Sequence, residues 1–129
     1  MSRFQGIIAG MLVWLTSCTS TPVVSARPHL DVQVLGFSGC PNTPELLMRV
    51  KHAAVAAGFS EQIVYVDLAR LPETDQLRAW PAPTVLVDGR DLLGMTKPAG
   101  SALGCRIYAD GLPDVAFIAK RFTQPHASR

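Results

Sequence analysis

The chain has 129 residues, of which 48% are hydrophobic, and its formal net charge is only +2 at pH 7. This length and composition are typical of one globular domain with an apolar core, and they exclude a chain that is disordered throughout. Acidic and basic residues are interspersed, and no basic run is longer than Lys120-Arg121, so the charge signature of a nucleic-acid-binding protein is missing. We therefore expect no nucleic-acid partner.

The N-terminal segment is typical of an export signal. Arg3 precedes an apolar run, Gly6–Leu15, that is too short for a typical membrane span. The run ends in Leu15-Thr16-Ser17-Cys18, which resembles a bacterial lipobox. The resemblance implies cleavage before a lipidated Cys18, and Thr19 after it implies the periplasmic face of the outer membrane. The alternative is an ordinary signal peptide cleaved near Ser25-Ala26.

The segment after Cys18 is rich in Ser, Thr, Pro and Val and has no periodicity, which indicates an extended tether. The expected organisation is a signal peptide over 1–17, an anchor and tether over 18–29, one domain over 30–123 and a loose tail over 124–129. With Cys18 assigned to the anchor, Cys40 and Cys105 remain, in a compartment where disulfides persist.

The first half of the domain predicts a strand, a helix and a second strand. Leu30–Phe37 alternates apolar and polar residues before becoming wholly apolar, which predicts a strand. A helix is expected from Pro44 to a left-handed cap at Gly58. Its apolar face would comprise Leu46, Leu47, Val50, Ala53, Ala54 and Ala57. Ile63–Val66 predicts a strand buried on both faces and parallel to the first.

The second half predicts a short helix, a hairpin and a final helix. Glu73–Ala79 is expected to be helical and to end before Pro81. Asp88-Gly89 is the dipeptide that best supplies the positive φ angles of a two-residue turn, so Thr84–Val87 and Arg90–Leu93 should form a β-hairpin. A loop over 94–104 follows, and Pro113 begins a last helix whose apolar stripe is Val115, Ile118, Ala119 and Phe122.

Cys40 is the residue where chemistry is expected, because it lies between the first strand and the first helix. Unsatisfied backbone N–H groups and the helix dipole at such a junction stabilise a thiolate and lower the pKa of a thiol. The alternative is that Cys40 is a small buried apolar residue, since free cysteines are among the most buried residues in proteins.

The order of elements, with Cys40-Pro41 before the helix and Pro83-Thr84 opening the hairpin, resembles the thioredoxin fold. The resemblance covers nearly all of Leu30–Phe122 and implies an α/β domain with a mixed four-stranded sheet flanked by helices. It also implies a cis bond before Pro83 and makes Pro41 and Pro83 substrate-facing. The usual second cysteine of the motif is replaced by Thr43, whose hydroxyl is expected to donate to the Cys40 thiolate.

A second cysteine comes from another part of the chain. Cys40-Pro41-Asn42, Pro83–Asp91 and Leu103–Tyr108 together resemble small thioredoxin-like proteins sometimes labelled as relatives of alkylmercury lyase. That label implies thiol-dependent cleavage of carbon–mercury bonds, although the lyase itself is a larger protein. In the thioredoxin-like topology the strand after the hairpin turn runs towards Cys40, so the loop beyond Leu93 is expected to bring Cys105 to it.

Cys40 and Cys105 are therefore the expected catalytic pair, with Thr43 assisting and no cofactor. The preferred function is thiol-based redox exchange with a thiol protein. One alternative is a soft-metal site, in which both thiolates bind Hg(II) or Cu(I), or an activity like that of alkylmercury lyase. The other is a non-catalytic interaction module stapled by a permanent disulfide between the two residues.

Overall fold

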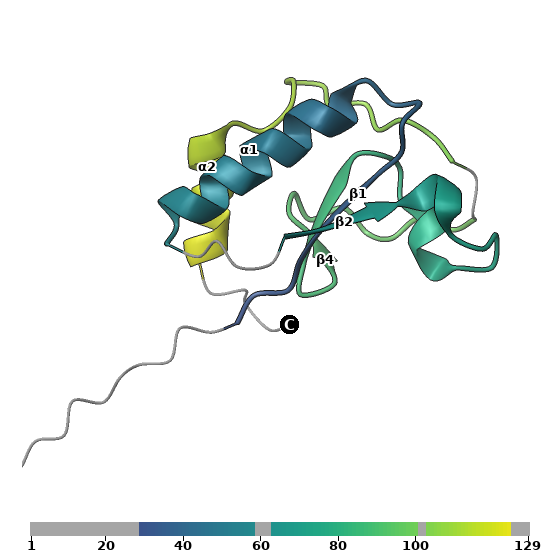
Figure 1. Cartoon of the computed structure of the whole chain (residues 1–129), viewed down its shortest axis with the longest axis horizontal. Coiled ribbons are helices and arrows are strands. Elements are labelled where there is room, and N and C mark those ends of the chain that lie inside the picture. Colours follow the sequence, from purple (N-terminus) through teal and green to yellow (C-terminus); the bar gives the residue numbers. More distant parts are fainter. Residues whose placement is uncertain (1–28, 59–62, 101–102, 125–129) are drawn as a thin grey trace, which may run out of the picture.

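The computed structural model describes residues 29–58, 63–100 and 103–124. The expected signal peptide, Cys18, nearly all of the tether and the tail beyond residue 124 lie outside the described residues. The elements in chain order are β1 (Val32–Gly36), α1 (Asn42–Ala56), β2 (Ile63–Asp67), the 3-10 turns η1 (Leu68–Arg70) and η2 (Gln76–Ala79), β3 (Thr84–Val87), β4 (Arg90–Asp91) and α2 (Val115–Thr123) (Figure 1).

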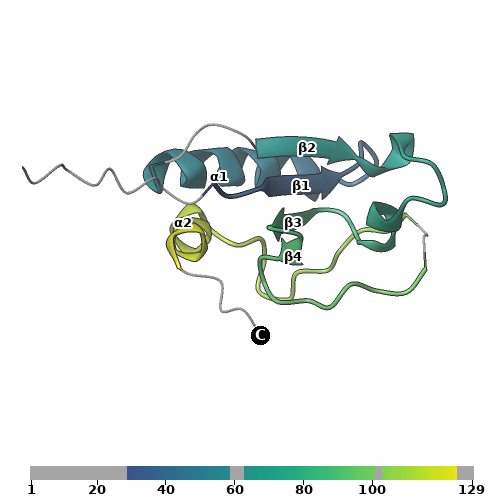
Figure 2. The ribbon, with the colours of Figure 1, turned by 90° about the horizontal axis from the view of Figure 1, so that it is seen from below.

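The strands form one mixed sheet in the order β2-β1-β3-β4, which Figure 2 shows from below. β1 pairs with β2 in parallel, and the pairs β1–β3 and β3–β4 are antiparallel. The parallel pair is connected through α1, because a parallel connection needs a crossover segment. The predicted α/β class with a mixed four-stranded sheet is therefore confirmed.

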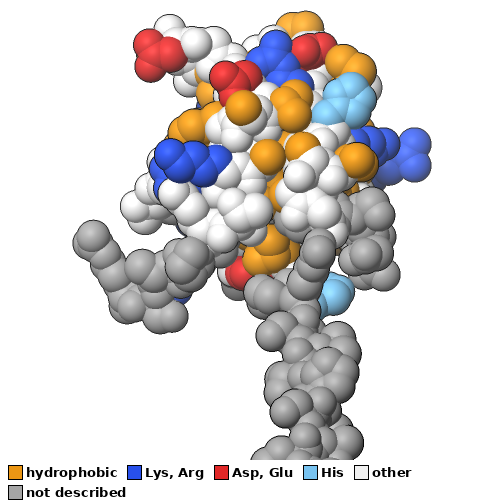
Figure 3. All heavy atoms as spheres, turned by 90° about the vertical axis from the view of Figure 1, so that its left-hand side faces the viewer, with side chains coloured by type: hydrophobic (Ala, Val, Ile, Leu, Met, Phe, Trp, Pro, Cys, Tyr) orange, Lys and Arg blue, Asp and Glu red, His pale blue; other side chains and the backbone are white. Residues whose placement is uncertain are grey.

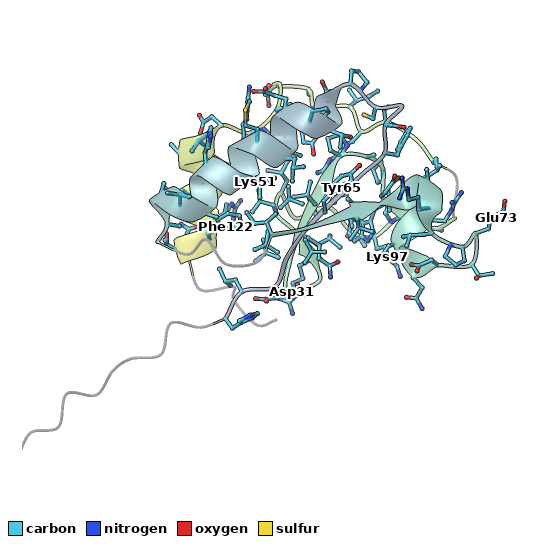
Figure 4. All side chains as sticks on the ribbon, in the orientation of Figure 1. Asp31, Lys51, Tyr65, Glu73, Lys97 and Phe122 are labelled. Atoms are coloured by element: carbon cyan, nitrogen blue, oxygen red, sulfur yellow. The ribbon has the colours of Figure 1, made fainter. Side chains whose placement is uncertain are left out.

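The β3–β4 hairpin has the turn that its sequence predicts. Asp88 and Gly89 have φ angles of 51° and 76°, as the favoured two-residue turn requires. The hairpin is joined to the start of β1, where the Asp31 N–H donates to Asp88 Oδ1 at 3.0 Å and the Asp88 N–H donates to the Asp31 carbonyl at 2.8 Å. Figure 4 labels Asp31 beside this turn. β4 itself is short and pairs only through Arg90 and Asp91.

The larger apolar cluster lies between the sheet and both α-helices. Alternate residues of a strand point to the same face, and here Val32 and Val34 of β1 share a face with Val85 and Val87 of β3. The helices add Leu46, Val50, Ala53 and Ala54 from α1 and Ile118 and Phe122 from α2. Figure 1 shows the two helices side by side, and Figure 4 labels Phe122 on α2. The helices thus cover one face of the sheet.

A smaller cluster covers the opposite face, where no α-helix lies in the described part of the chain. It comprises Leu35, Cys40, Leu68, Trp80, Ala82 and Leu86. Trp80 is buried here, so it covers the core and does not line a surface groove. Cys40 therefore belongs to the less extensively covered side of the sheet.

The structure corrects two sequence predictions. The side chains of Val64 and Tyr65 in β2 are 48% and 41% exposed, so the prediction of a strand buried on both faces is wrong. β2 is an edge strand, and its Ile63 packs against the helix-covered cluster but is only partly buried. The predicted helix over Glu73–Ala79 is reduced to η2, because the Asp75 carboxylate accepts from the Leu77 N–H and starts the turn only there.

The first helix begins at Asn42, two residues earlier than predicted, since a proline such as Pro44 is tolerated in the first turn, where N–H groups lack partners. Gly58, with φ of 79°, follows the last turn as expected. Within the described ranges, no helix is long and apolar enough to cross a membrane. The side of the molecule shown in Figure 3 carries apolar side chains interspersed with acidic and basic ones.

Candidate functional site

Cys40 lies in the turn between β1 and α1. Its N–H donates to the Phe37 carbonyl at 3.1 Å, and its carbonyl accepts from the Thr43 N–H at 3.2 Å. These bonds close the turn and place the cysteine directly before Pro41, the N-cap of α1. The side chain turns inward, and only 1% of Cys40 is exposed.

The Cys40 thiol donates a hydrogen bond to the Ala82 carbonyl at 3.2 Å. The peptide bond between Ala82 and Pro83 is cis, as the resemblance implied. Pro83 is fully buried, so its ring is not at the surface where a substrate would meet it, whereas Pro41 is exposed. Of the two prolines expected to face a substrate, the structure therefore leaves only Pro41 accessible.

Backbone pairing brings the segment around Cys105 to the same place. The Ala82 N–H donates to the Gly104 carbonyl at 2.7 Å, and the Arg106 N–H donates to the Ala82 carbonyl at 2.6 Å. Together they form an isolated parallel bridge between Ala82 and Cys105. The Ala82 carbonyl thus accepts from both the Cys40 thiol and the backbone beside Cys105.

The two thiols interact directly. A hydrogen bond with Cys40 raises the pKa of the Cys105 thiol, since the bond stabilises its protonated form. The two residues differ in accessibility, because Cys40 is buried and Cys105 is exposed. The structure therefore brings a buried and an exposed cysteine, from segments that are far apart in the chain, to the same residue, Ala82.

An ion pair holds the segment after Cys105. Arg106 donates to both oxygens of Asp91, from Nη1 to Oδ1 at 2.6 Å and from Nη2 to Oδ2 at 3.1 Å. The Asp91 side chain is fully buried and that of Arg106 is 10% exposed. Asp91 Oδ2 also accepts from the N–H groups of Leu93 and Met95. Burial acts to lower the pKa of Arg106, but the Asp91 carboxylate outweighs it and the net shift is upward.

Tyr108 adds a second attachment. Its hydroxyl donates to the Pro83 carbonyl, and the Arg106 guanidinium lies 4.9 Å from the centroid of its ring. Burial raises the pKa of Tyr108 to about 12, so the phenol remains a donor at neutral pH. Arg106 and Tyr108 together fix the path of the chain on either side of the exposed Ile107.

Thr43 does not make the hydrogen bond to Cys40 that its hydroxyl was expected to donate. Its side chain is buried against Gly36, where an added Cβ would lie only 2.3 Å from Thr43 Cγ2. The Thr43 hydroxyl has no hydrogen-bond partner among the described residues. Thr43 therefore packs the end of β1 against the first turn of α1, with one unsatisfied hydroxyl beside the cysteine turn.

Sequence reasoning did not single out Asp91, Arg106 or Tyr108 as parts of the site. Asp91 had a detectable signal, because it is an acid at an inward position of a hairpin strand, opposite Leu86. A buried carboxylate needs a cationic partner, but the sequence alone does not identify which one. The described residues contain no group of three or more His, Cys, Asp or Glu side chains that could hold a metal ion.

No protein-family model matches the chain, and it matches neither a curated protein nor a solved structure.

Proposed function

We propose that this chain is an exported, lipid-anchored, thioredoxin-like protein in which Cys40 and Cys105 carry out thiol–disulfide exchange with a disulfide-containing substrate. One observation carries the proposal. Cys40 and Cys105 come from separate segments and meet at Ala82, whose carbonyl accepts from the Cys40 thiol and whose backbone pairs with the backbone around Cys105, and the neighbouring Cys40 thiol raises the pKa of Cys105. Two thiols in contact can form a disulfide without a large backbone movement, which is the requirement for reversible two-electron exchange.

The reaction consists of two sulfur displacements. One thiolate of the pair attacks a substrate disulfide R–S–S–R′, forms a mixed disulfide with one substrate sulfur and releases the other as a thiolate. The second cysteine then attacks the mixed disulfide, closes the Cys40–Cys105 bond and releases the remaining substrate thiolate. Two electrons pass to the substrate, and the two protons lost by the cysteines are taken up by the substrate thiols. A dithiol protein would reverse these steps and restore the pair.

The thioredoxin-like interpretation is supported by the position of the site in the sheet. Cys40 follows β1 at the start of α1 and faces the residue before Pro83, which leads into the antiparallel β3. Two features depart from the usual pattern. Thr43 replaces the second motif cysteine, and both α-helices lie on one face of the sheet. Cys105, which follows the hairpin in the chain and pairs with Ala82, supplies the second thiol.

A soft-metal function is the second candidate, and the same pair of sulfurs favours it. Hg(II) and Cu(I) prefer thiolate ligands and accept two of them, and no third ligand group lies among the described residues. An activity like that of alkylmercury lyase would use the same two thiolates on a carbon–mercury bond. The third alternative is a permanent disulfide that only staples the segment around Cys105 to the sheet.

A disulfide reagent separates these functions. The full-length chain carrying Cys18→Ser is reduced, freed of reductant and mixed with dithiobis(nitrobenzoate). Thiol exchange predicts release of two thionitrobenzoates per chain, with a product in which Cys40 and Cys105 are joined. It also predicts that a dithiol reductant at low concentration restores both thiols. Release of one thionitrobenzoate with a stable mixed disulfide would contradict the proposed function.

The alternatives have their own outcomes in the same preparation. A metal-binding protein predicts one Hg(II) per chain with an affinity that both Cys40→Ser and Cys105→Ser abolish, while the disulfide closes slowly or not at all. A structural staple predicts a disulfide that persists in excess dithiol reductant until the chain unfolds. Either result would contradict thiol exchange and favour the corresponding alternative.

The anchor has a separate test in cells. Labelled fatty acid should be incorporated into the wild-type chain and not into Cys18→Ala, because only a cysteine at the lipobox receives the lipid. A mature chain that begins near Ala26 and carries no label would contradict the anchor and would support ordinary secretion. The proposed exchange chemistry does not depend on this result.

A further inference from the structure

We propose that Cys105 is the thiol that first attacks the substrate disulfide and that the buried Cys40 is the resolving thiol. This order rests on the proposed exchange function and differs from the sequence expectation, in which the position at a helix start makes Cys40 the more reactive thiol. It follows from the accessibility of the two sulfurs, from the direction in which a substrate can approach, and from the contacts that hold the segment around Cys105.

The two cysteines differ in how accessible they are to a substrate. Cys40 is 1% exposed and lies in the cluster that includes Leu35, Trp80 and Ala82. A disulfide in a folded substrate cannot bring its sulfur into contact with this thiol without displacing part of the cluster. Cys105 is exposed, and its neighbour Ile107 is 92% exposed. The surface around Cys105 is therefore open to a large partner.

The second step is the direction of attack. In thiol–disulfide exchange the attacking, central and leaving sulfurs lie close to one line. If Cys105 forms the mixed disulfide, the substrate sulfur lies outward, and the buried Cys40 lies on the interior side of Cys105. Cys40 is then placed opposite the leaving group. If Cys40 formed the mixed disulfide, the substrate would have to occupy buried space or the position of Cys105.

The third step is the state of the Cys40 thiol. Its hydrogen is donated to the Ala82 carbonyl, which also accepts from the Arg106 N–H. This hydrogen bond fixes the reduced Cys40 side chain in the interior, next to the backbone of the segment that carries Cys105. When Cys105 becomes part of a mixed disulfide, the proton of Cys40 passes to solvent or to the departing substrate thiolate.

The segment that carries Cys105 is built to keep that residue outward. Exposed and inward residues alternate along it, with Cys105 and Ile107 outward and Arg106 and Tyr108 held by Asp91 and by the Pro83 carbonyl. Arg106 thus holds the residue directly after the cysteine, and the Ala82 N–H holds the Gly104 carbonyl directly before it, while the cysteine itself is exposed. Arg106 and Asp91 are therefore positioning residues for the attacking sulfur.

The rate of the first step should also depend on pH in a particular way. The hydrogen bond with Cys40 raises the pKa of Cys105. A higher pH is therefore needed to form the attacking thiolate than for an ordinary thiol. Cys40→Ala removes the group that causes the upward shift. The pH profile for alkylation of Cys105 should then move to lower pH, and alkylation at pH 8 should be faster than in the wild type.

The decisive experiment compares single-thiol chains. Cys40→Ser and Cys105→Ser, each with Cys18→Ser, are mixed with dithiobis(nitrobenzoate), and the rate of the first release is measured. We expect Cys40→Ser to react at least about tenfold faster than Cys105→Ser, because burial limits access to a thiol. In guanidinium chloride the two rates should become similar, since unfolding exposes both cysteines.

The result that overturns the inference is a folded Cys105→Ser chain that reacts as fast as folded Cys40→Ser. A second measurement avoids reliance on variants. The reduced chain carrying only Cys18→Ser is treated with substoichiometric iodoacetamide, and the labelled peptide is identified by mass spectrometry. Label on Cys105 supports the order, and label on Cys40 contradicts it. If the internal disulfide failed to close, the proposed function would be contradicted, but the order in which the two thiols react would not be.

Discussion

The two faces of the sheet are stabilised in different ways. On the face covered by α1 and α2, aliphatic residues from both helices interlock with alternate residues of β1 and β3. On the opposite face a smaller cluster surrounds Cys40, and the chain around Cys105 is attached by backbone pairing, an ion pair and a tyrosine hydroxyl. The first arrangement contains most of the buried apolar residues of the two clusters. The second determines where one thiol lies relative to the other.

Apolar packing and charged hydrogen bonds respond differently to substitution. Apolar packing is non-directional, so a lost methyl group weakens the fold without moving a particular atom far. Charged hydrogen bonds have strict geometry, so losing one of them frees the segment that it held. Substitutions on the two faces should therefore differ in whether they change the thiol chemistry along with the stability.

The largest loss of stability is expected on the helix face. Leu46 of α1 is fully buried, and Leu46→Ala should lower the free energy of unfolding by about 3 to 4 kcal/mol, because it removes apolar burial and leaves a cavity. Urea unfolding measures the loss, and Leu93→Ala at a side chain that is 39% exposed is the matched control. Under folding conditions the rate of thiol exchange should not change.

Asp91→Asn tests the other face. It removes the carboxylate that pairs with the buried Arg106 guanidinium and should lower the free energy of unfolding by about 3 kcal/mol. The segment around Cys105 should also loosen, so closure of the internal disulfide slows while the first attack by Cys105 does not. Stopped-flow release of thionitrobenzoate separates the two steps.

Asp110→Asn is the control for that change, since Asp110 is exposed and pairs with no other residue of the described part of the chain. It should alter neither the stability nor the two rates. If Asp91→Asn also left the closing step unchanged, the ion pair would have a purely structural role and would not position Cys105.

A smaller effect is expected where β1 meets α1. Gly36→Ala should lower the free energy of unfolding by about 2 kcal/mol, because the new Cβ would lie 2.3 Å from Thr43 Cγ2. Thr43→Ala alone should cost little, since its buried hydroxyl has no partner among the described residues. The double variant should recover part of the loss, and chemical denaturation of all four chains measures the coupling. Additive losses would contradict the close contact.

The smallest effect concerns alkaline pH. The chain has two tyrosines, so tyrosinate absorbance in Tyr65→Phe reports on Tyr108 alone. Burial raises the pKa of Tyr108 to about 12, above the value near 10 of an unfolded chain. Its contribution to stability should therefore be complete below about pH 10 and decline as the pH rises towards 12. Ionisation of Tyr108 near pH 10 in the folded protein would show that the phenol is not buried in solution.

Sequence patterns identified the elements that depend on local chemistry. Asp88-Gly89 has the backbone preference of the hairpin turn, and the spacing of Leu46, Val50 and Ala53 matches one helix face wherever that helix packs. The exposure of β2 was mispredicted because a short β-branched run looks the same at an edge as in the middle of a sheet. Its environment depends on strand order and on where the helices lie.

The cysteine pair shows the same division. The position of Cys40 between a strand and a helix was visible in the sequence, and strand directions in the proposed topology brought Cys105 towards it. Which thiol would be buried was not visible, because that depends on the bridge to Ala82 and on the pairing of Arg106 with Asp91. Charged residues in a loop sequence normally indicate a solvated surface, and only the folded chain shows this pair buried.

The central claim is that Cys40 and Cys105 form a reversible redox pair, and the most direct test is equilibration in glutathione redox buffers. The full-length Cys18→Ser chain is brought to equilibrium at a series of potentials, quenched with acid and alkylated, and its peptides are mapped. The account predicts a single two-electron transition between a dithiol and an intramolecular Cys40–Cys105 disulfide. Two outcomes would contradict it: disulfides that form between chains and never within one chain, or stable glutathione adducts on Cys105 at all potentials.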